Sequence, residues 1–133
     1  MSLLQLNEIC PGLVAFLDPA ILKRYGVAGP SLADEVHPFV CVEVCGHRST
    51  WTMLTSKPGH GRPSLPSQFK QGQCASWLEN QSYLSQALEG PSHAFQEASA
   101  KSELSRPGCR HSVTEKGVAF VLNHIRRPDS RSA

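Results

Sequence analysis

Two apolar segments near the middle of the chain, residues 37–44 and 51–56, flank a short polar stretch that contains Gly46. Both segments are rich in β-branched and aromatic residues, which suit a pleated, half-buried surface. A glycine between two such segments lets the chain reverse its direction. The pattern therefore predicts a β-hairpin over residues 37–56.

Near the end of the chain, the apolar positions follow the period of a helix instead. They are spaced at i, i+3, i+4 and i+7, and comprise Val118, Val121, Leu122 and Ile125. That spacing places them on one face of a helix. Ser112 or Thr114 can cap the first turn, and the two arginines before Pro128 suit the last turn. We predict a helix over residues 112–127 and a disordered tail over residues 129–133.

The first part of the chain has weaker patterns. Residues 1–32 look helical in pieces, because Asp18 can cap a helix that has Pro19 in its first turn and that ends at Gly26. We therefore expect a helical lead-in there.

Beyond the hairpin, residues 57–66 contain three prolines and two glycines, a composition that predicts an exposed loop. Residues 71–97 fit two descriptions. One has short strands at Trp77-Leu78 and at residues 94–98, separated by Gly90-Pro91, and the other has a helix over residues 79–88. We favour the strands.

Composition narrows the class of protein. A chain of 133 residues, 40% hydrophobic and 18% charged, suits one globular domain, which we place at residues 1–128. No apolar run approaches the ~20 residues of a membrane span, and no secretory signal is recognisable, so we expect a cytoplasmic protein without a membrane partner. The formal net charge of +2 does not by itself indicate nucleic-acid binding.

The hairpin carries a family resemblance. His37-Pro38 opens an aliphatic strand, and after the turn a second strand closes on Met53-Leu54-Thr55-Ser56. Over about residues 36–63 this arrangement resembles the PemK/MazF-like toxins. The resemblance implies a mainly β fold with peripheral helices, in which a small SH3-like barrel over residues 33–111 precedes the C-terminal helix. It also implies a homodimer, a cognate antitoxin as partner, and cleavage of single-stranded RNA without a metal or other cofactor.

Such cleavage needs a base for the 2′-hydroxyl, a cation for the phosphorane and a donor for the leaving oxygen. In the family, an Arg at the head of the first strand and a Thr at the end of the second take part. Thr55 matches the Thr, but His37 stands in place of the Arg, and an imidazole cannot make the two-pronged contact of a guanidinium. We expect His37 to act as acid or base and Thr55 as hydroxyl donor. Arg62 is the expected catalytic cation, and the expected RNA-binding residues are Arg48, Lys57 and His60.

The departure at His37 leaves a second interpretation open, a non-catalytic barrel module that binds a partner protein or a small ligand. In that case His37 packs at the strand edge and bonds to a backbone carbonyl, and Thr55 is an ordinary strand residue.

Five scattered cysteines, an odd number, predict reduced thiols. Cys41 and Cys45, four residues apart on a strand, face the same side and can contribute to a zinc site together with an imidazole. The other members of this group are His47 and, far along the chain, Cys109 and His111. The short spacing of zinc knuckles is absent, so we favour core packing and expect no metal. Trp51 and Trp77 are likewise assigned to the core rather than to base stacking.

Overall fold

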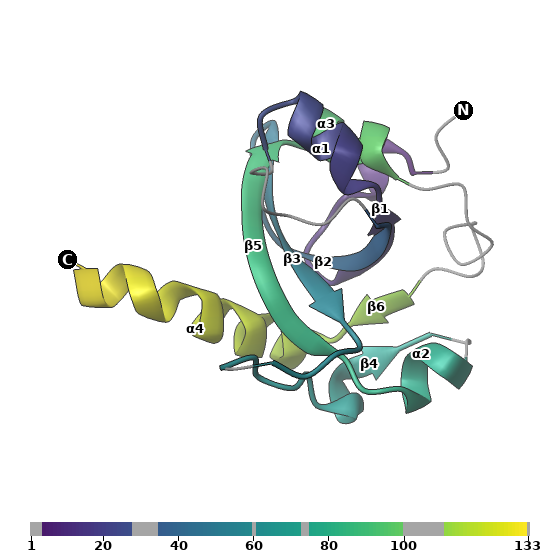
Figure 1. The fold of residues 1–133 in the computed structure, drawn as a ribbon. Coiled ribbons are helices and arrows are strands. Elements are labelled where there is room, and N and C mark those ends of the chain that lie inside the picture. Colours follow the sequence, from purple (N-terminus) through teal and green to yellow (C-terminus); the bar gives the residue numbers. More distant parts are fainter. Residues whose placement is uncertain (1–3, 28–34, 60, 73–74, 100–110, 133) are drawn as a thin grey trace.

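The computed structural model describes residues 4–27, 35–59, 61–72, 75–99 and 111–132, the last seven of these as backbone alone. Its strands are β1 (Leu13–Leu17), β2 (His37–Cys45), β3 (Arg48–Thr55), β4 (Lys70–Gln71), β5 (Tyr83–Pro91) and β6 (His111–Val113). Its helices are α1 (Pro19–Arg24), α2 (Ala75–Glu79), α3 (Ser92–Ala98) and α4 (Glu115–Ser132), with 3-10 turns η1 (Leu6–Glu8) and η2 (Ser67–Phe69). The predicted mainly β fold with peripheral helices is confirmed (Figure 1).

The six strands form one sheet in the order β4-β6-β1-β2-β3-β5, with antiparallel neighbours throughout. The sheet curves strongly (Figure 1), yet within the described ranges no pairing joins its two end strands, β4 and β5. Residues 63–65 occupy the outer edge of β5 at its start, where Ser64 pairs with Tyr83. The predicted SH3-like barrel is therefore not closed over the described residues, where the sheet stays open between β4 and β5.

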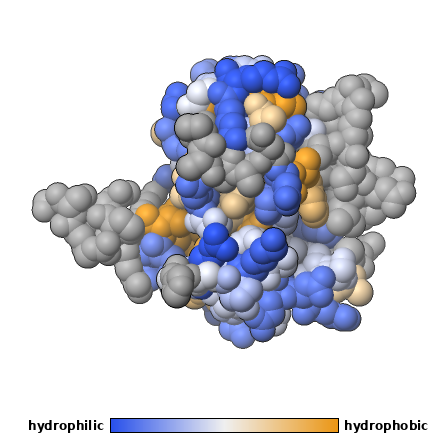
Figure 2. Space-filling model, in the orientation of Figure 1, coloured by the Kyte–Doolittle hydropathy of each residue, from blue (hydrophilic) through white to orange (hydrophobic). Residues whose placement is uncertain are grey.

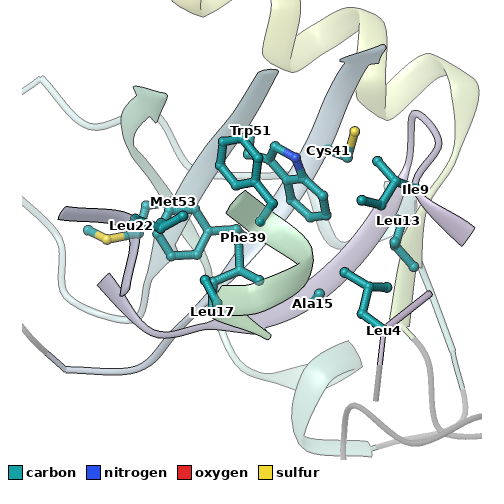
Figure 3. Close-up of a cluster of buried hydrophobic side chains, with 12 residues drawn as sticks. Leu4, Ile9, Leu13, Ala15, Leu17, Leu22, Phe39, Cys41, Trp51 and Met53 are labelled. Atoms are coloured by element: carbon teal, nitrogen blue, oxygen red, sulfur yellow. The ribbon is translucent and has the colours of Figure 1, made fainter. Parts of the chain in front are cut away.

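The β2–β3 hairpin is confirmed. Both of its faces are buried over residues 39–42 and 51–55, whereas the residues next to the turn are exposed. One face carries Phe39, Trp51 and Met53, which pack with residues from β1, α1 and α3 into the cluster drawn in Figure 3. The other face carries Val40 and Leu54, which pack against α2, β6 and α4. Because neither face meets water over these buried residues, the strands have continuous apolar runs there instead of a clean alternation.

The helical lead-in is wrong in its centre, where Leu13–Leu17 forms β1 between β2 and β6. Four of its five residues are buried, so the run is apolar throughout, and periodicity cannot separate such a strand from a buried helix. The helix that follows is confirmed. Asp18 accepts a hydrogen bond from the backbone N–H of Ala20 at 3.0 Å, and Gly26 ends the helix with φ +73°.

The strands that we favoured within residues 71–97 are wrong. Trp77-Leu78 and residues 94–98 lie in helices α2 and α3, and most of the segment considered as a helix is strand β5. Pairing of β5 with β3 over residues 83–91 overrides the weak local preference of that sequence.

The C-terminal helix is confirmed as α4, although residues 112 and 113 at its predicted start belong to β6. Val118 and Val121 are buried, and Leu122 and Ile125 are partly buried and pack against the same cluster. Thr114 is its cap, since its Oγ1 accepts a hydrogen bond from Gly117 N–H at 3.1 Å. The backbone stays helical to Ser132, past the predicted end at residue 127, and α4 extends away from the sheet (Figure 1). Among the described residues no helix combines the length and apolar character needed to cross a membrane. Among the coloured residues in Figure 2, hydrophilic ones predominate, with smaller hydrophobic patches between them.

Candidate functional site

A cavity of about 700 Å³ opens at the end of the hairpin opposite its turn. Its lining comes from the start of β2, the end of β3 with the loop that follows, the α2–β5 connection and β6. This volume is typical of pockets that bind a small ligand or part of a larger one. Three predicted catalytic residues, His37, Thr55 and Arg62, line it, as does Lys57.

His37 is the first residue of β2, and its Nδ1 lies 2.8 Å from the carbonyl oxygen of Glu35. A carbonyl oxygen only accepts hydrogen bonds, so Nδ1 carries the hydrogen and donates it. Nε2 is therefore the nitrogen that gains or loses a proton. This hydrogen bond to a backbone carbonyl is the one expected if His37 only packs at the strand edge. It is also compatible with a role as acid or base, because it holds the ring in one orientation.

Thr55 ends β3 and is nearly buried, with 9% of its surface exposed. Phe39 of β2 lies opposite Met53 of β3. His37 lies two residues before Phe39, and Thr55 lies two residues after Met53. Because side chains alternate along both strands, His37 and Thr55 share one face of the hairpin. The Oγ1 of Thr55 accepts a hydrogen bond from Lys57 N–H at 3.2 Å.

Arg62 is fixed by the loop that follows β3. Its Nη1 donates to the carbonyl oxygen of Lys57 at 3.1 Å, and its backbone N–H donates to the carbonyl oxygen of Gly59 at 3.2 Å. A side chain at Gly59 would place its Cβ 3.1 Å from the guanidinium of Arg62, so the glycine gives the Arg62 side chain room to lie against the loop. The loop thereby places a permanent cation in the lining of the cavity that Thr55 also lines.

Arg48 is not brought to this cavity. It begins β3 and forms a two-pronged ion pair with Glu89, in which Nη2 lies 2.9 Å from Oε1. Seven residues of strand separate it from Thr55, about 23 Å at the usual rise. The structure therefore does not bring Arg48 together with His37, Thr55 and Arg62, and its role in binding RNA stays a prediction. His60, the remaining predicted residue, lies outside the described residues.

The sequence analysis missed the aromatic part of the lining. His111 of β6 stacks on Trp77 of α2 with ring centroids 5.1 Å apart and an interplanar angle of 7°, and it meets the edge of Phe16 at 6.4 Å. His111 is 2% exposed, and its Nδ1 has no hydrogen-bond partner among the described residues. Burial, and next the nearby charge of Lys70, lower the pKa of His111 below its ordinary value.

Lys70 was missed as well. Its Nζ is enclosed, donates to the carbonyl oxygens of Trp77 at 2.9 Å and Asn80 at 2.6 Å, and lies 4.5 Å from the centre of the Trp77 ring. Burial lowers the pKa of Lys70. A lysine between Phe69 and Gln71 gives no sequence signal for a buried ammonium, because long cations are usually solvated.

Core packing of Cys41 is confirmed. Its register with β3 shifts between Cys41 and Glu43, so that Cys41 is buried while Cys45 is exposed, and the two thiols do not share a face. Burial raises the pKa of Cys41 to about 12. Within the described ranges no cluster of potential ligands can hold a metal ion. Trp51 and Trp77 are both buried, as predicted.

Comparison of the chain with protein-family models, with curated proteins and with solved structures finds no match.

Proposed function

We propose that this protein binds single-stranded RNA in the cavity at the end of the hairpin and cleaves it without a metal. One observation carries the proposal. His37, Thr55 and Arg62 were selected from the sequence for this chemistry, and all three line one cavity.

In the proposed reaction, the neutral Nε2 of His37 takes the proton of a ribose 2′-hydroxyl. The 2′-oxygen forms a bond to phosphorus and the bond from phosphorus to the 5′-oxygen breaks. The products are a 2′,3′-cyclic phosphate and a free 5′-hydroxyl. The leaving oxygen takes its proton from water, and His37 returns its proton to water.

Arg62 and Thr55 stabilise the phosphorane. The guanidinium of Arg62 supplies a fixed positive charge next to the phosphoryl oxygens, and Lys57 adds a second charge at the rim. The hydroxyl of Thr55 accepts from Lys57 N–H, so its own hydrogen can be donated to a phosphoryl oxygen.

The test is cleavage of end-labelled single-stranded RNA in EDTA by wild type, His37→Ala, Arg62→Ala and Arg48→Ala. We expect His37→Ala to lose about 100-fold or more in rate, the usual contribution of a proton-transfer residue. Arg62→Ala should also lose most activity. Arg48→Ala is the matched control, because Arg48 lies at the other end of the hairpin, and it should cleave like wild type.

Equal cleavage by wild type and the His37→Ala, Arg62→Ala double variant would reject the assignment. If wild type binds the RNA but leaves it intact, the cavity binds RNA without cleaving it and the proposed reaction is rejected. If wild type neither binds nor cleaves the RNA, the second interpretation takes its place, a non-catalytic module that binds a partner protein or a small ligand.

A further inference from the structure

The lining of the cavity divides by chemistry. Its cations are Lys57 and Arg62, which lie near His37 and the carboxylate of Glu35, and His111 belongs to the aromatic part. The α2–β5 connection supplies uncharged polar side chains instead, from Ser76, Asn80, Gln81, Ser82, Ser85 and Gln86. Amides and hydroxyls of this kind pair with the edges of unstacked bases, whereas cations hold phosphate. We call this second group, residues 76–86, the amide wall.

Several contacts from other elements hold the amide wall in place. The ammonium of Lys70 bonds the carbonyl oxygens of Trp77 and Asn80 at the end of α2, and Trp77 Nε1 donates to Gln71 O at 2.9 Å. On the other side, Leu65 N–H donates to Ser82 O at 2.8 Å. These contacts hold the backbone of the amide wall in place at Trp77, Asn80 and Ser82.

Within the wall, the amide of Gln81 has a defined orientation. The hydroxyl of Tyr83 lies 2.5 Å from Oε1 of Gln81 and donates to it. Tyr83 is itself paired with Thr55 across β3 and β5. With the amide oxygen engaged, Gln81 presents its NH₂ group, which only donates.

From this geometry we infer that Gln81 reads the base of the bound nucleotide and selects uracil and guanine over cytosine and adenine. Uracil has a carbonyl oxygen at position 4 and guanine has one at position 6, and both accept from the NH₂ group. Cytosine and adenine have an amino group at those positions, which would meet the Gln81 donor with another donor. The inference rests on the proposed function and specifies its substrate. Tyr83 acts as a positioning residue.

The test uses binding alone. Labelled oligouridine and oligocytidine of equal length, both 2′-O-methylated so that they cannot be cleaved, are titrated with the protein and followed by fluorescence anisotropy. Wild type should bind oligouridine about three- to tenfold more tightly, the worth of one neutral hydrogen bond. Gln81→Ala should bring the ratio close to one.

Two further variants test the direction of the effect. Gln81→Glu should reverse the preference, because a carboxylate accepts from the amino group of cytosine. Tyr83→Phe should reduce the ratio, since the amide is then able to turn. Gln68→Ala, an exposed glutamine on η2 outside the cavity, is the control and should keep the wild-type ratio.

Equal binding of the two oligonucleotides by wild type, or an unchanged preference in Gln81→Ala, would overturn base reading by Gln81 while leaving RNA binding intact. Binding of neither oligonucleotide by wild type would overturn both proposals.

Discussion

Thr55 and Arg62 both bind the backbone of Lys57 through their side chains. Thr55 Oγ1 accepts a hydrogen bond from the N–H of Lys57 at 3.2 Å, and Arg62 Nη1 donates one to the carbonyl oxygen of Lys57 at 3.1 Å. Both backbone polar groups of Lys57 are thus satisfied by side chains that line the cavity. The loop after β3 and the candidate catalytic groups therefore hold each other in position.

Replacement of Thr55 tests this arrangement. Thr55→Val keeps the shape of the side chain but removes the acceptor for Lys57 and the donor for phosphate. We expect it to lower RNA cleavage at least tenfold and the free energy of unfolding by about 1 kcal/mol. Thr55→Ser keeps the hydroxyl and should retain most of the activity. Cleavage by Thr55→Val at the wild-type rate would remove Thr55 from the mechanism.

Lys70→Met tests the anchoring of α2. The substitution preserves much of the side-chain volume but leaves the carbonyl oxygens of Trp77 and Asn80 without their donor. We expect the free energy of unfolding to fall by about 1–3 kcal/mol, measured by urea denaturation. Lys57→Met is the control, because Lys57 is exposed, and it should change stability by less than about 0.5 kcal/mol. Equal effects of the two substitutions would contradict an anchoring role.

His111 should make stability depend on pH. Its pKa in the folded protein lies below the ordinary value of 6.5, so the unfolded chain binds more protons as the pH falls through that value. The stability that the neutral ring provides is complete above pH 6.5 and is lost as the pH falls towards the lower pKa of the folded state. Thermal unfolding across pH 5–8 measures this effect.

His111→Phe is the diagnostic variant for that profile. It keeps a ring to stack on Trp77 but removes the titrating group and the unpartnered Nδ1, so the acid-induced loss should become smaller. His47→Gln, at an exposed histidine in the hairpin turn, should leave the profile unchanged. A profile of His111→Phe that coincides with wild type would assign the pH dependence to other groups.

Gly117 in α4 is a position where alanine should destabilise the helix, although alanine usually stabilises helices. Alanine is favoured over glycine by ~1 kcal/mol in an exposed helix interior. A Cβ at position 117 would, however, lie 2.3 Å from Val113 Cγ1 and 2.7 Å from Phe69 Cβ. We expect Gly117→Ala to lower the melting temperature, because overpacking costs about 1–3 kcal/mol. Ala119→Gly, at an exposed position in α4, tests the ordinary preference and should cost ~1 kcal/mol.

Sequence reasoning was most successful where one local signal determined the structure. The hairpin has a glycine turn between two apolar segments, and α4 has a cap at Thr114 with one apolar face. It failed at β1 and β5, where pairing with distant strands decides the structure. The open sheet was missed for a related reason, because only the folded chain places residues 63–65 on the edge of β5.

The candidate site was predictable in part. His37 and Thr55 end adjacent strands of a single hairpin, so their proximity follows from its register. Arg62 lies close enough along the chain to return to Thr55. Arg48 was misplaced because nearness in sequence does not show which end of a strand a residue occupies. His111 enters through β6, which pairs with β1 across almost a hundred residues, and no local pattern marks it.

The pairing of β6 with β1 has a consequence for synthesis of the protein. The ribosome makes the chain from its N-terminus, so His37, Thr55 and Arg62 all emerge well before His111. The nascent hairpin then lacks the stacked pair of His111 and Trp77 that lines part of its cavity. Completion of the pocket is consequently a late event, and fragments that stop short of β6 should remain unable to assemble it.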